Sequence, residues 1–180
     1  MRAGAPLRGF CLAACLVAGL VTWAPAASAG PAPSGQPARS ADVARLAAAG
    51  IAAAQLRPGW SIVGDKIWWD GGNIKRSITP TAFICDTGYV CLFEHADLLG
   101  SLLEIRSPIN TYLYMPNYGF NDVMSSWQNK RGLDARWYYH TGGVPNPNRC
   151  MPYPGGQEHL TSADNDQMST LYIYNSTTVC

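Results

Sequence analysis

The sequence contains two matching six-residue stretches, Asn121-Asp122-Val123-Met124-Ser125-Ser126 and Asn165-Asp166-Gln167-Met168-Ser169-Thr170. The second begins 44 residues after the first, and a repeat at this spacing predicts two similar supersecondary units within one domain. Both stretches are rich in amide, carboxylate and hydroxyl oxygens, which are hard donors that suit calcium. They also fit a simpler role, in which Asn-Asp opens a turn and the hydroxyl residues close it.

The region around these stretches, residues 83–180, has the pattern of an all-β domain. Its apolar segments are short, its turns are frequent, and it lacks the periodicity of an amphipathic helix. Tyrosine and tryptophan, which favour strands, are dense throughout it. The pattern predicts an all-β sandwich.

A helix and a hairpin are predicted before this domain. Ser40-Ala41-Asp42 can cap a helix over residues 40–56, which Gly50 weakens. Strand-forming residues over 60–79, interrupted by Asp70-Gly71-Gly72-Asn73, predict a β-hairpin.

Two adjacent tryptophans in this hairpin, Trp68 and Trp69, are expected to point to opposite faces of a strand. One of them can pack on the domain while the other covers an edge of the sheet. The alternative is that they form a platform that stacks on carbohydrate.

The first 29 residues have the features of a removable secretory leader. Arg2 and Arg8 give a positive start, Phe10–Trp23 is apolar, and Ala27-Ser28-Ala29 supplies small residues for cleavage. After the leader, no apolar run approaches the roughly 20 residues that a membrane helix needs. The protein is therefore expected to be secreted and extracellular, without a membrane association after cleavage.

The sequence thus divides into a signal peptide over 1–29, a flexible tail and short helix over 30–58, a β-hairpin appendage over 59–82, and the β domain over 83–180. One alternative concerns the leader, because Leu12-Ala13-Ala14-Cys15 resembles a bacterial lipoprotein box.

Four cysteines follow the leader, which in an exported chain predicts two disulfides with three possible pairings. Cys85 and Cys91 are six residues apart with Gly88 between them, so a local loop can close. Cys150 and Cys180 would then pair. Zinc binding is disfavoured, since the spacings contain no Cys-x-x-Cys.

Charge and motif content exclude several classes of function. Removing Arg2 and Arg8 from the 13 basic residues leaves 11 against 12 acidic ones, and a near-neutral chain does not suit nucleic-acid binding. His95, His140 and His159 are isolated, and no metalloprotease, nucleophile-elbow or phosphate-loop motif is present. We therefore expect no enzymatic activity.

The two stretches resemble (N/D)-(N/D)-x-x-(S/T)-S, the calcium signature of microbial βγ-crystallin domains. Other features of residues 83–180 also look like this superfamily, and specifically like its secreted actinobacterial metalloproteinase inhibitors: the segment Cys85–His95, the hairpin residues Phe93 and Gly100, and Tyr118-Gly119-Phe120. The resemblance implies a βγ-crystallin-like Greek-key sandwich, here with an N-terminal helix and β-hairpin appendage.

The resemblance also implies a calcium site built from both signatures. Its ligands would be the carbonyls of the third signature residues, the hydroxyls of the fifth and a hairpin carbonyl, which here are Val123, Gln167, Ser125, Ser169 and Glu94. The four leading residues would shape the loops and add negative potential; these are Asn121, Asp122, Asn165 and Asp166. With so few charged ligands, calcium binding is expected to be weak, with a Kd of about 0.1–1 mM.

The function implied by the resemblance is inhibition of a secreted, thermolysin-type metalloprotease. Residues 141–156 have the composition of a rigid exposed loop, since four prolines limit the freedom of the chain before binding. Thermolysin-like enzymes favour a large apolar residue after the scissile bond, so Cys150-Met151 is the expected contact. Met151 can instead be covered by the prolines. The alternative function is that of a calcium-stabilised structural or envelope-associated protein that inhibits nothing.

Overall fold

A computed structural model describes residues 39–80, 84–142 and 146–180, so the leader expected over 1–29 lies outside the described residues. Helical elements are the α-helix α1 and four short 3₁₀ turns: α1 Ser40–Ala48, η1 Ala53–Gln55, η2 Asp70–Gly72, η3 Ala96–Leu98 and η4 Met115–Tyr118. The strands are β1 Ser61–Val63, β2 Lys66–Trp69, β3 Ile74–Ser77, β4 Val90–His95, β5 Leu99–Ile105, β6 Tyr112–Tyr114, β7 Ser126–Asn129, β8 Ala135–Tyr138, β9 Asn148–Met151, β10 Gly155–Gln157 and β11 Thr170–Ile173.

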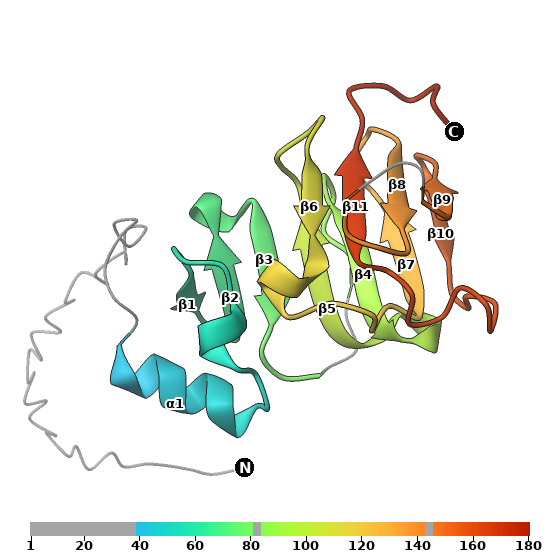
Figure 1. Cartoon of the computed structure of the whole chain (residues 1–180). Coiled ribbons are helices and arrows are strands. Elements are labelled where there is room, and N and C mark those ends of the chain that lie inside the picture. Colours follow the sequence, from blue (N-terminus) through green and yellow to red (C-terminus); the bar gives the residue numbers. More distant parts are fainter. Residues whose placement is uncertain (1–38, 81–83, 143–145) are drawn as a thin grey trace, which may run out of the picture. The chain divides into compact units, whose positions relative to one another are not determined.

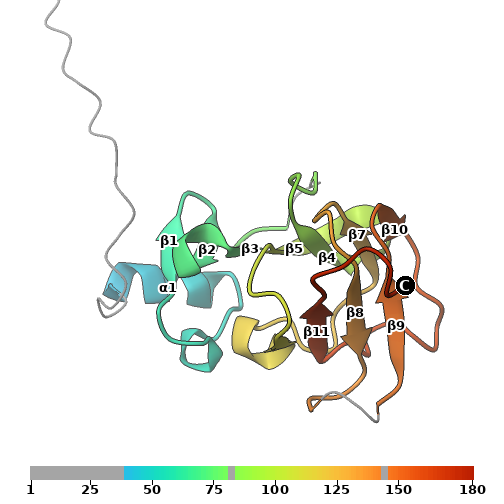
Figure 2. The same ribbon diagram turned by 90° about the horizontal axis from the view of Figure 1, so that it is seen from above.

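The strands form two antiparallel sheets that pack face to face (Figures 1 and 2). Sheet A has the order β1-β2-β3-β5-β4-β7-β10, and sheet B has the order β6-β11-β8-β9. The chain from β4 to β7 places its third strand, β6, in sheet B, and the chain from β8 to β11 places its third strand, β10, in sheet A. This exchange makes two interlocked Greek keys, which confirms the expected βγ-crystallin-like sandwich.

The core lies between the two sheets and follows from the alternation of apolar residues along the strands. Its members come from both Greek keys and include side chains that are completely buried: Leu92, Leu103, Phe120, Met124, Trp137, Met168 and Leu171. The two methionines belong to the two signature stretches, one in each. Each signature loop is therefore anchored in the core by its own side chain.

Both disulfides have the pairing that the spacing predicted, Cys85–Cys91 and Cys150–Cys180. The first belongs to a smaller apolar cluster on the outer face of sheet A, where Cys91 packs with Phe93. The second ties strand β9 to the C-terminal residue of the chain.

The N-terminal segment departs from the predicted helix and hairpin in two ways. Helix α1 ends at Ala48, because Gly50 adopts a left-handed conformation with φ of +72° and its N–H bonds back to the carbonyl of Ala47. The expected hairpin is present as β2 and β3. An additional turn at Gly64, whose φ is +63°, joins β2 to a further strand, β1, that pairs with it. Within the described part of the chain, no helix has the length and apolar character to cross a membrane.

This N-terminal segment, residues 39–78, which we call the appendage, is integral to the sandwich. Strand β3 pairs antiparallel with β5, so the appendage extends sheet A (Figure 1). Trp69 is fully buried with its ring edge-on to Tyr118 at 5.2 Å, and its indole N–H donates to the carbonyl of Arg57 at 3.0 Å. Arg76 donates to the carbonyl of Tyr118 at 3.1 Å. Trp69 is therefore the tryptophan of the pair that packs on the domain.

Its neighbour Trp68 lies on the opposite face of β2 and is half-buried. Its ring covers Gly72, where a Cβ atom would come within 2.9 Å of ring carbons, and Lys75 lies 5.8 Å from the ring centroid. The two tryptophans therefore do not share one platform.

We expect Trp69→Ala to lower the free energy of unfolding of the whole domain by about 3–5 kcal/mol, because it leaves a large cavity between the appendage and η4. Trp68→Ala is the matched control and should cost clearly less, about 1–2 kcal/mol. Urea unfolding followed by fluorescence and far-UV circular dichroism should give one shared transition. Two separate transitions, or an unchanged domain stability in Trp69→Ala, would show that the appendage folds independently.

Candidate functional site

The two signature loops lie against each other and are joined by reciprocal backbone hydrogen bonds. The N–H of Asp122 donates to the carbonyl of Met168 at 3.0 Å, and the N–H of Asp166 donates to the carbonyl of Met124 at 3.1 Å. Both aspartates adopt left-handed conformations, with φ of +52° and +54°, which Asp tolerates better than most residues. The structure thus brings together the two stretches that the sequence paired.

The first signature also bonds to the opening hairpin of its own Greek key. The N–H of Ser125 donates to the carbonyl of Phe93 at 3.0 Å, and the hydroxyl of Ser126 donates to the carbonyl of His95 at 2.6 Å. Glu94 lies between these two acceptors, so its backbone runs beside the signature loop. Its carboxylate accepts from the N–H of Ser101 at 3.0 Å, within the hairpin. Burial would raise the pKa of Glu94, but this hydrogen bonding holds it below its usual value.

The second signature repeats this arrangement. The N–H of Ser169 donates to the carbonyl of Tyr138 at 3.0 Å, and the hydroxyl of Thr170 donates to the carbonyl of His140 at 2.9 Å. Threonine in place of serine therefore preserves the bond. The counterpart of Glu94 is Tyr139, a residue that the sequence analysis missed. The signal was present, since Tyr139 lies 30 residues before Ser169, much as Glu94 lies 31 before Ser125.

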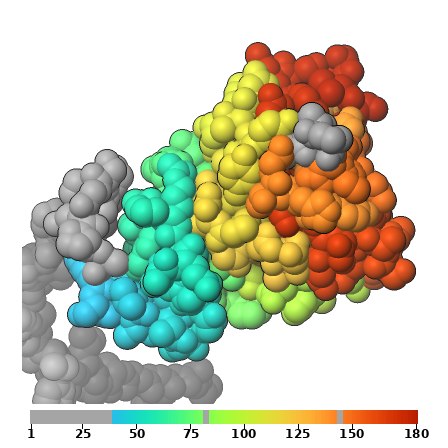
Figure 3. Space-filling model, in the orientation of Figure 1, coloured from blue at the N-terminus to red at the C-terminus, as the bar shows by residue number. Residues whose placement is uncertain are grey.

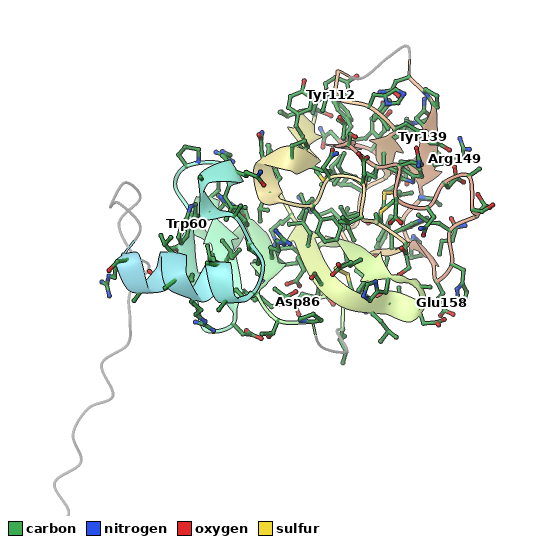
Figure 4. All side chains as sticks on the ribbon, turned by 60° about the horizontal axis from the view of Figure 1, so that its bottom comes forward. Trp60, Asp86, Tyr112, Tyr139, Arg149 and Glu158 are labelled. Carbon is green, nitrogen blue, oxygen red and sulfur yellow. A yellow bond between two sulfur atoms is a disulfide. The ribbon has the colours of Figure 1, made fainter. Side chains whose placement is uncertain are left out.

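A polar network holds Tyr139 in place where the first hairpin uses Glu94. The ring of Tyr139 stacks on Trp137, with centroids 5.1 Å apart, and its hydroxyl donates to the carboxylate of Asp164. Arg149 donates to the Tyr139 hydroxyl at 3.0 Å and forms an ion pair with Asp164 at 2.7 Å (Figure 4). The network links β8, β9 and the segment before the second signature.

Several side-chain oxygen atoms lie around the paired loops. The hydroxyl of Ser169 donates to Asp122 at 3.1 Å, which brings a hydroxyl of one signature to the carboxylate of the other. The side-chain carbonyl oxygen of Asn121 is buried and has no hydrogen-bond partner among the residues that the structure describes. In the described ranges no group of three or more His, Cys, Asp and Glu side chains is close enough to share a metal ion. A site here would therefore depend on carbonyls and hydroxyls.

The expected protease contact at Cys150-Met151 needs correction. Met151 ends strand β9 and is completely buried, because it pairs with Ala135 and faces the core between the sheets. Its carbonyl accepts from the side-chain amide of Asn129 at 2.8 Å. Cys150 is half-buried and disulfide-bonded. The prediction that Met151 presents its side chain to a protease is wrong for this fold.

The segment 141–156 is also not one loop, since β9 and the start of β10 occupy part of it. Its exposed part after β9 is the tight turn Pro152-Tyr153-Pro154, which we call the braced turn. It connects β9 in sheet B to β10 in sheet A. Tyr153 is 41% exposed. A Cβ at Gly155 would lie 2.5 Å from the carbonyl oxygen of Pro152, so the turn closes only with glycine there.

A hydrogen bond to the buried side chain of Asp134 holds the braced turn in place. The sequence analysis missed Asp134. Asp134 is 1% exposed, and its carboxylate accepts three backbone N–H groups, from Tyr153 at 3.0 Å, Val179 at 2.9 Å and Cys180 at 3.0 Å. Burial would raise the pKa of Asp134, but the three donors outweigh it and hold the pKa below its usual value. One buried carboxylate thus holds the turn and the C-terminal segment together.

The three histidines lie in different surroundings. His159 pairs with Asp97 at 2.9 Å on the surface, and the ring of His140 lies edge-on to Tyr139. His95 lies over Gly100 in the first hairpin.

Part of the chain is similar to a known protein family. Residues 79–151 match the model of peptidase inhibitor family I36, which is less than half of the chain. This domain is similar to peptidase inhibitor family I36. The match ends at Met151, just before the braced turn, and it excludes the whole appendage. No curated protein matches the sequence significantly.

Solved βγ-crystallin domains cover about half of this chain and almost all of their own. A βγ-crystallin from Ciona intestinalis is 22% identical, covers 48% of this chain and 99% of its own, and has a TM-score of 0.40. A double mutant of a Clostridium beijerinckii βγ-crystallin domain is 20% identical, covers 49% and 98%, and has a TM-score of 0.39. A structure concerning the evolution of the eye-lens βγ-crystallin domain fold is 20% identical, covers 52% and 93%, and has a TM-score of 0.44.

Over residues 79–151 the chain is therefore similar to a family of peptidase inhibitors, and these residues belong to a βγ-crystallin-like fold. Its two disulfides are typical of an oxidising, extracellular compartment.

The buried Asp134 carboxylate predicts a stability that depends on pH. Because its folded pKa lies below the ordinary value of 3.8, its contribution is present above that pH and is lost as the pH falls through the folded pKa. We expect Asp134→Asn to lower the free energy of unfolding at pH 7 by about 3 kcal/mol and to flatten the loss of stability below pH 4. Urea unfolding between pH 2.5 and 7 tests this, with the exposed Asp65→Asn as control. An equal pH profile in both variants would contradict it.

Proposed function

We propose that the protein is a secreted inhibitor of thermolysin-type metalloproteases, exported by the leader over residues 1–29 and without enzymatic activity of its own. The observation that carries the proposal is the braced turn, which presents an aromatic side chain on a backbone that is already fixed. The match to an inhibitor family supports the general activity.

The braced turn suits inhibition because its ordering is completed before a protease binds. Prolines flank Tyr153 on both sides, and Asp134 holds its N–H at 3.0 Å. The Cys150–Cys180 disulfide adjoins the turn. Binding to such a rigid segment loses little conformational entropy. Tyr153 therefore takes the role of the large apolar residue that the sequence analysis assigned to Met151.

Titration into a thermolysin assay at constant calcium should give stoichiometric inhibition. Tyr153→Asp should weaken inhibition by at least about 30-fold, as expected when a central interface side chain worth about 2 kcal/mol is lost. Tyr114→Asp is the matched control, since Tyr114 is 38% exposed in another part of the molecule. Equal inhibition by Tyr153→Asp would remove the braced turn from the interface, and no inhibition by the unmodified protein would refute the inhibitor function.

We further propose that the paired signatures bind calcium weakly. Ser125 and Ser169 would supply hydroxyls, Val123 and Gln167 would supply carbonyls, and the hairpin carbonyls of Glu94 and Tyr139 would complete two related protein ligand sets. Asn121, Asp122, Asn165 and Asp166 would contribute loop shape and negative potential. The buried, unpartnered oxygen of Asn121 and the bond from Ser169 to Asp122 support this assignment. Calcium would supply a positive charge that holds the two Greek keys together.

About 10 mM calcium should therefore raise the free energy of unfolding by about 1.4–2.7 kcal/mol per site, for a Kd of about 0.1–1 mM. Ser125→Ala and Ser169→Ala should each reduce the rise in melting temperature, whereas Ser61→Ala, in β1, should leave it unchanged. Melting curves with calcium and with chelator measure the effect. Identical curves for the unmodified protein would refute calcium binding.

A calcium-stabilised structural protein without inhibitory activity is the second candidate. The pairing of the two signature loops favours this candidate, because the candidate calcium site can form there without any role for the braced turn. A calcium-dependent melting temperature together with no protease inhibition would select it.

A further inference from the structure

A cleft lies between the appendage and the first Greek key, away from the braced turn. Its volume is about 390 Å³, within the range of small-molecule sites. The appendage and the segment that includes η4 meet here (Figure 3). The functional side chains that line it are Arg57 and Asp70 from the appendage and Tyr112, Tyr114 and Tyr118 from the first Greek key. Arg57 and Asp70 lie outside the segment that matches the inhibitor family.

The polar groups of the cleft are fixed but remain accessible. Arg57 forms a two-pronged pair with Asp70, at 2.9 and 3.2 Å, and also donates to the hydroxyl of Tyr118 at 3.3 Å. Hydrogen bonding to Asp70 raises the pKa of Arg57, and a guanidinium paired with a carboxylate carries no net charge. The side chains are 40% and 43% exposed, so each retains free hydrogen-bonding capacity.

The backbone on both sides of this pair is also held. The N–H of Arg57 donates to the carbonyl of Asn117 at 2.7 Å, and its carbonyl accepts from the indole of Trp69. Asp70 has a positive φ of +50°, and its carbonyl accepts from the side chain of Asn73 at 2.9 Å. Asp tolerates this conformation better than most residues, so the turn holds the Asp70 side chain in place beside Arg57.

Aromatic side chains form the other wall and continue beyond it. Tyr112 and Tyr114 alternate with buried Leu113 on β6, an edge strand of sheet B. Tyr112 lies 4.8 Å from Tyr172, which lies 4.8 Å from Tyr174. The rings make a continuous row over the outer face of sheet B. Tyr112, labelled in Figure 4, lies at the cleft end of the row.

We propose that this cleft binds a hexopyranose unit of a neutral polysaccharide, whose chain continues along the tyrosine row. Sugar rings present C–H faces that pack on aromatic rings and hydroxyls that need donors and acceptors together. The cleft supplies both, because Asp70 accepts, Arg57 donates, and the tyrosines are amphipathic. A neutral pair gives no net attraction to an anionic ligand.

Binding of the purified mature protein to microcrystalline cellulose, chitin and laminarin tests the proposal, by depletion for the solids and by affinity electrophoresis for laminarin. The protein should bind at least one of the three, and the binding should change little between 0.05 and 0.5 M NaCl. Tyr114→Ala and Asp70→Ala should each weaken that binding about five- to tenfold. Tyr153→Ala, on the braced turn, should bind like the unmodified protein.

Three results would overturn the proposal. The first two are no binding to any of the three polysaccharides, and equal binding by the unmodified protein, Tyr114→Ala and Asp70→Ala. Salt-sensitive retention on heparin in place of the neutral polymers would overturn it as well, since that would indicate an anionic ligand. Melting curves establish that each variant is folded, and unchanged thermolysin inhibition by Tyr114→Ala separates failure of this site from failure of the inhibitor function.

Discussion

Two reciprocal backbone hydrogen bonds, from Asp122 to Met168 and from Asp166 to Met124, hold the two Greek keys together. Each Greek key sends one strand into the other's sheet, so the chain must cross between the sheets at the signature loops. Buried polar backbone groups at such a crossing must find partners, and the two loops provide them for each other. The methionine of each signature, whose carbonyl accepts one of these bonds, has its side chain buried in the core. The crossing, the packing of the core and the positions of the oxygen atoms of the candidate calcium site therefore depend on one arrangement.

The sequence predicted this arrangement because the information is local and occurs twice. Within each signature, an aspartate that tolerates a left-handed conformation is followed by a methionine for the core and by a hydroxyl residue for the hairpin carbonyl. Thr170 departs from the usual serine, yet its hydroxyl makes the same bond to His140 that Ser126 makes to His95. The disulfide pairing was likewise predictable, since one six-residue loop restricted the alternatives.

What the sequence could not supply is the register between distant strands. Composition identified 141–156 as rigid, but burial of Met151 depends on its pairing with Ala135, and a shift by one residue would have turned its side chain to the other face. Asp134 shows the same limit, because the backbone groups it binds come from residues 153, 179 and 180. The pairing of β3 with β5 joins an appendage that carries no family signature to the domain.

The appendage solves a problem that the inhibitor-like core would have alone. Without it, β5 would be an open edge of sheet A, and open edges invite pairing with other chains. Strand β3 covers that edge, and the new edge is β1, which is only three residues long. The contacts that attach the appendage, from Trp69 and Arg76 to Tyr118, also set Arg57 and Asp70 opposite the tyrosines of β6. Protection of the edge and construction of the cleft therefore follow from one packing event, which leaves the braced turn at the β9–β10 end of the sandwich unchanged.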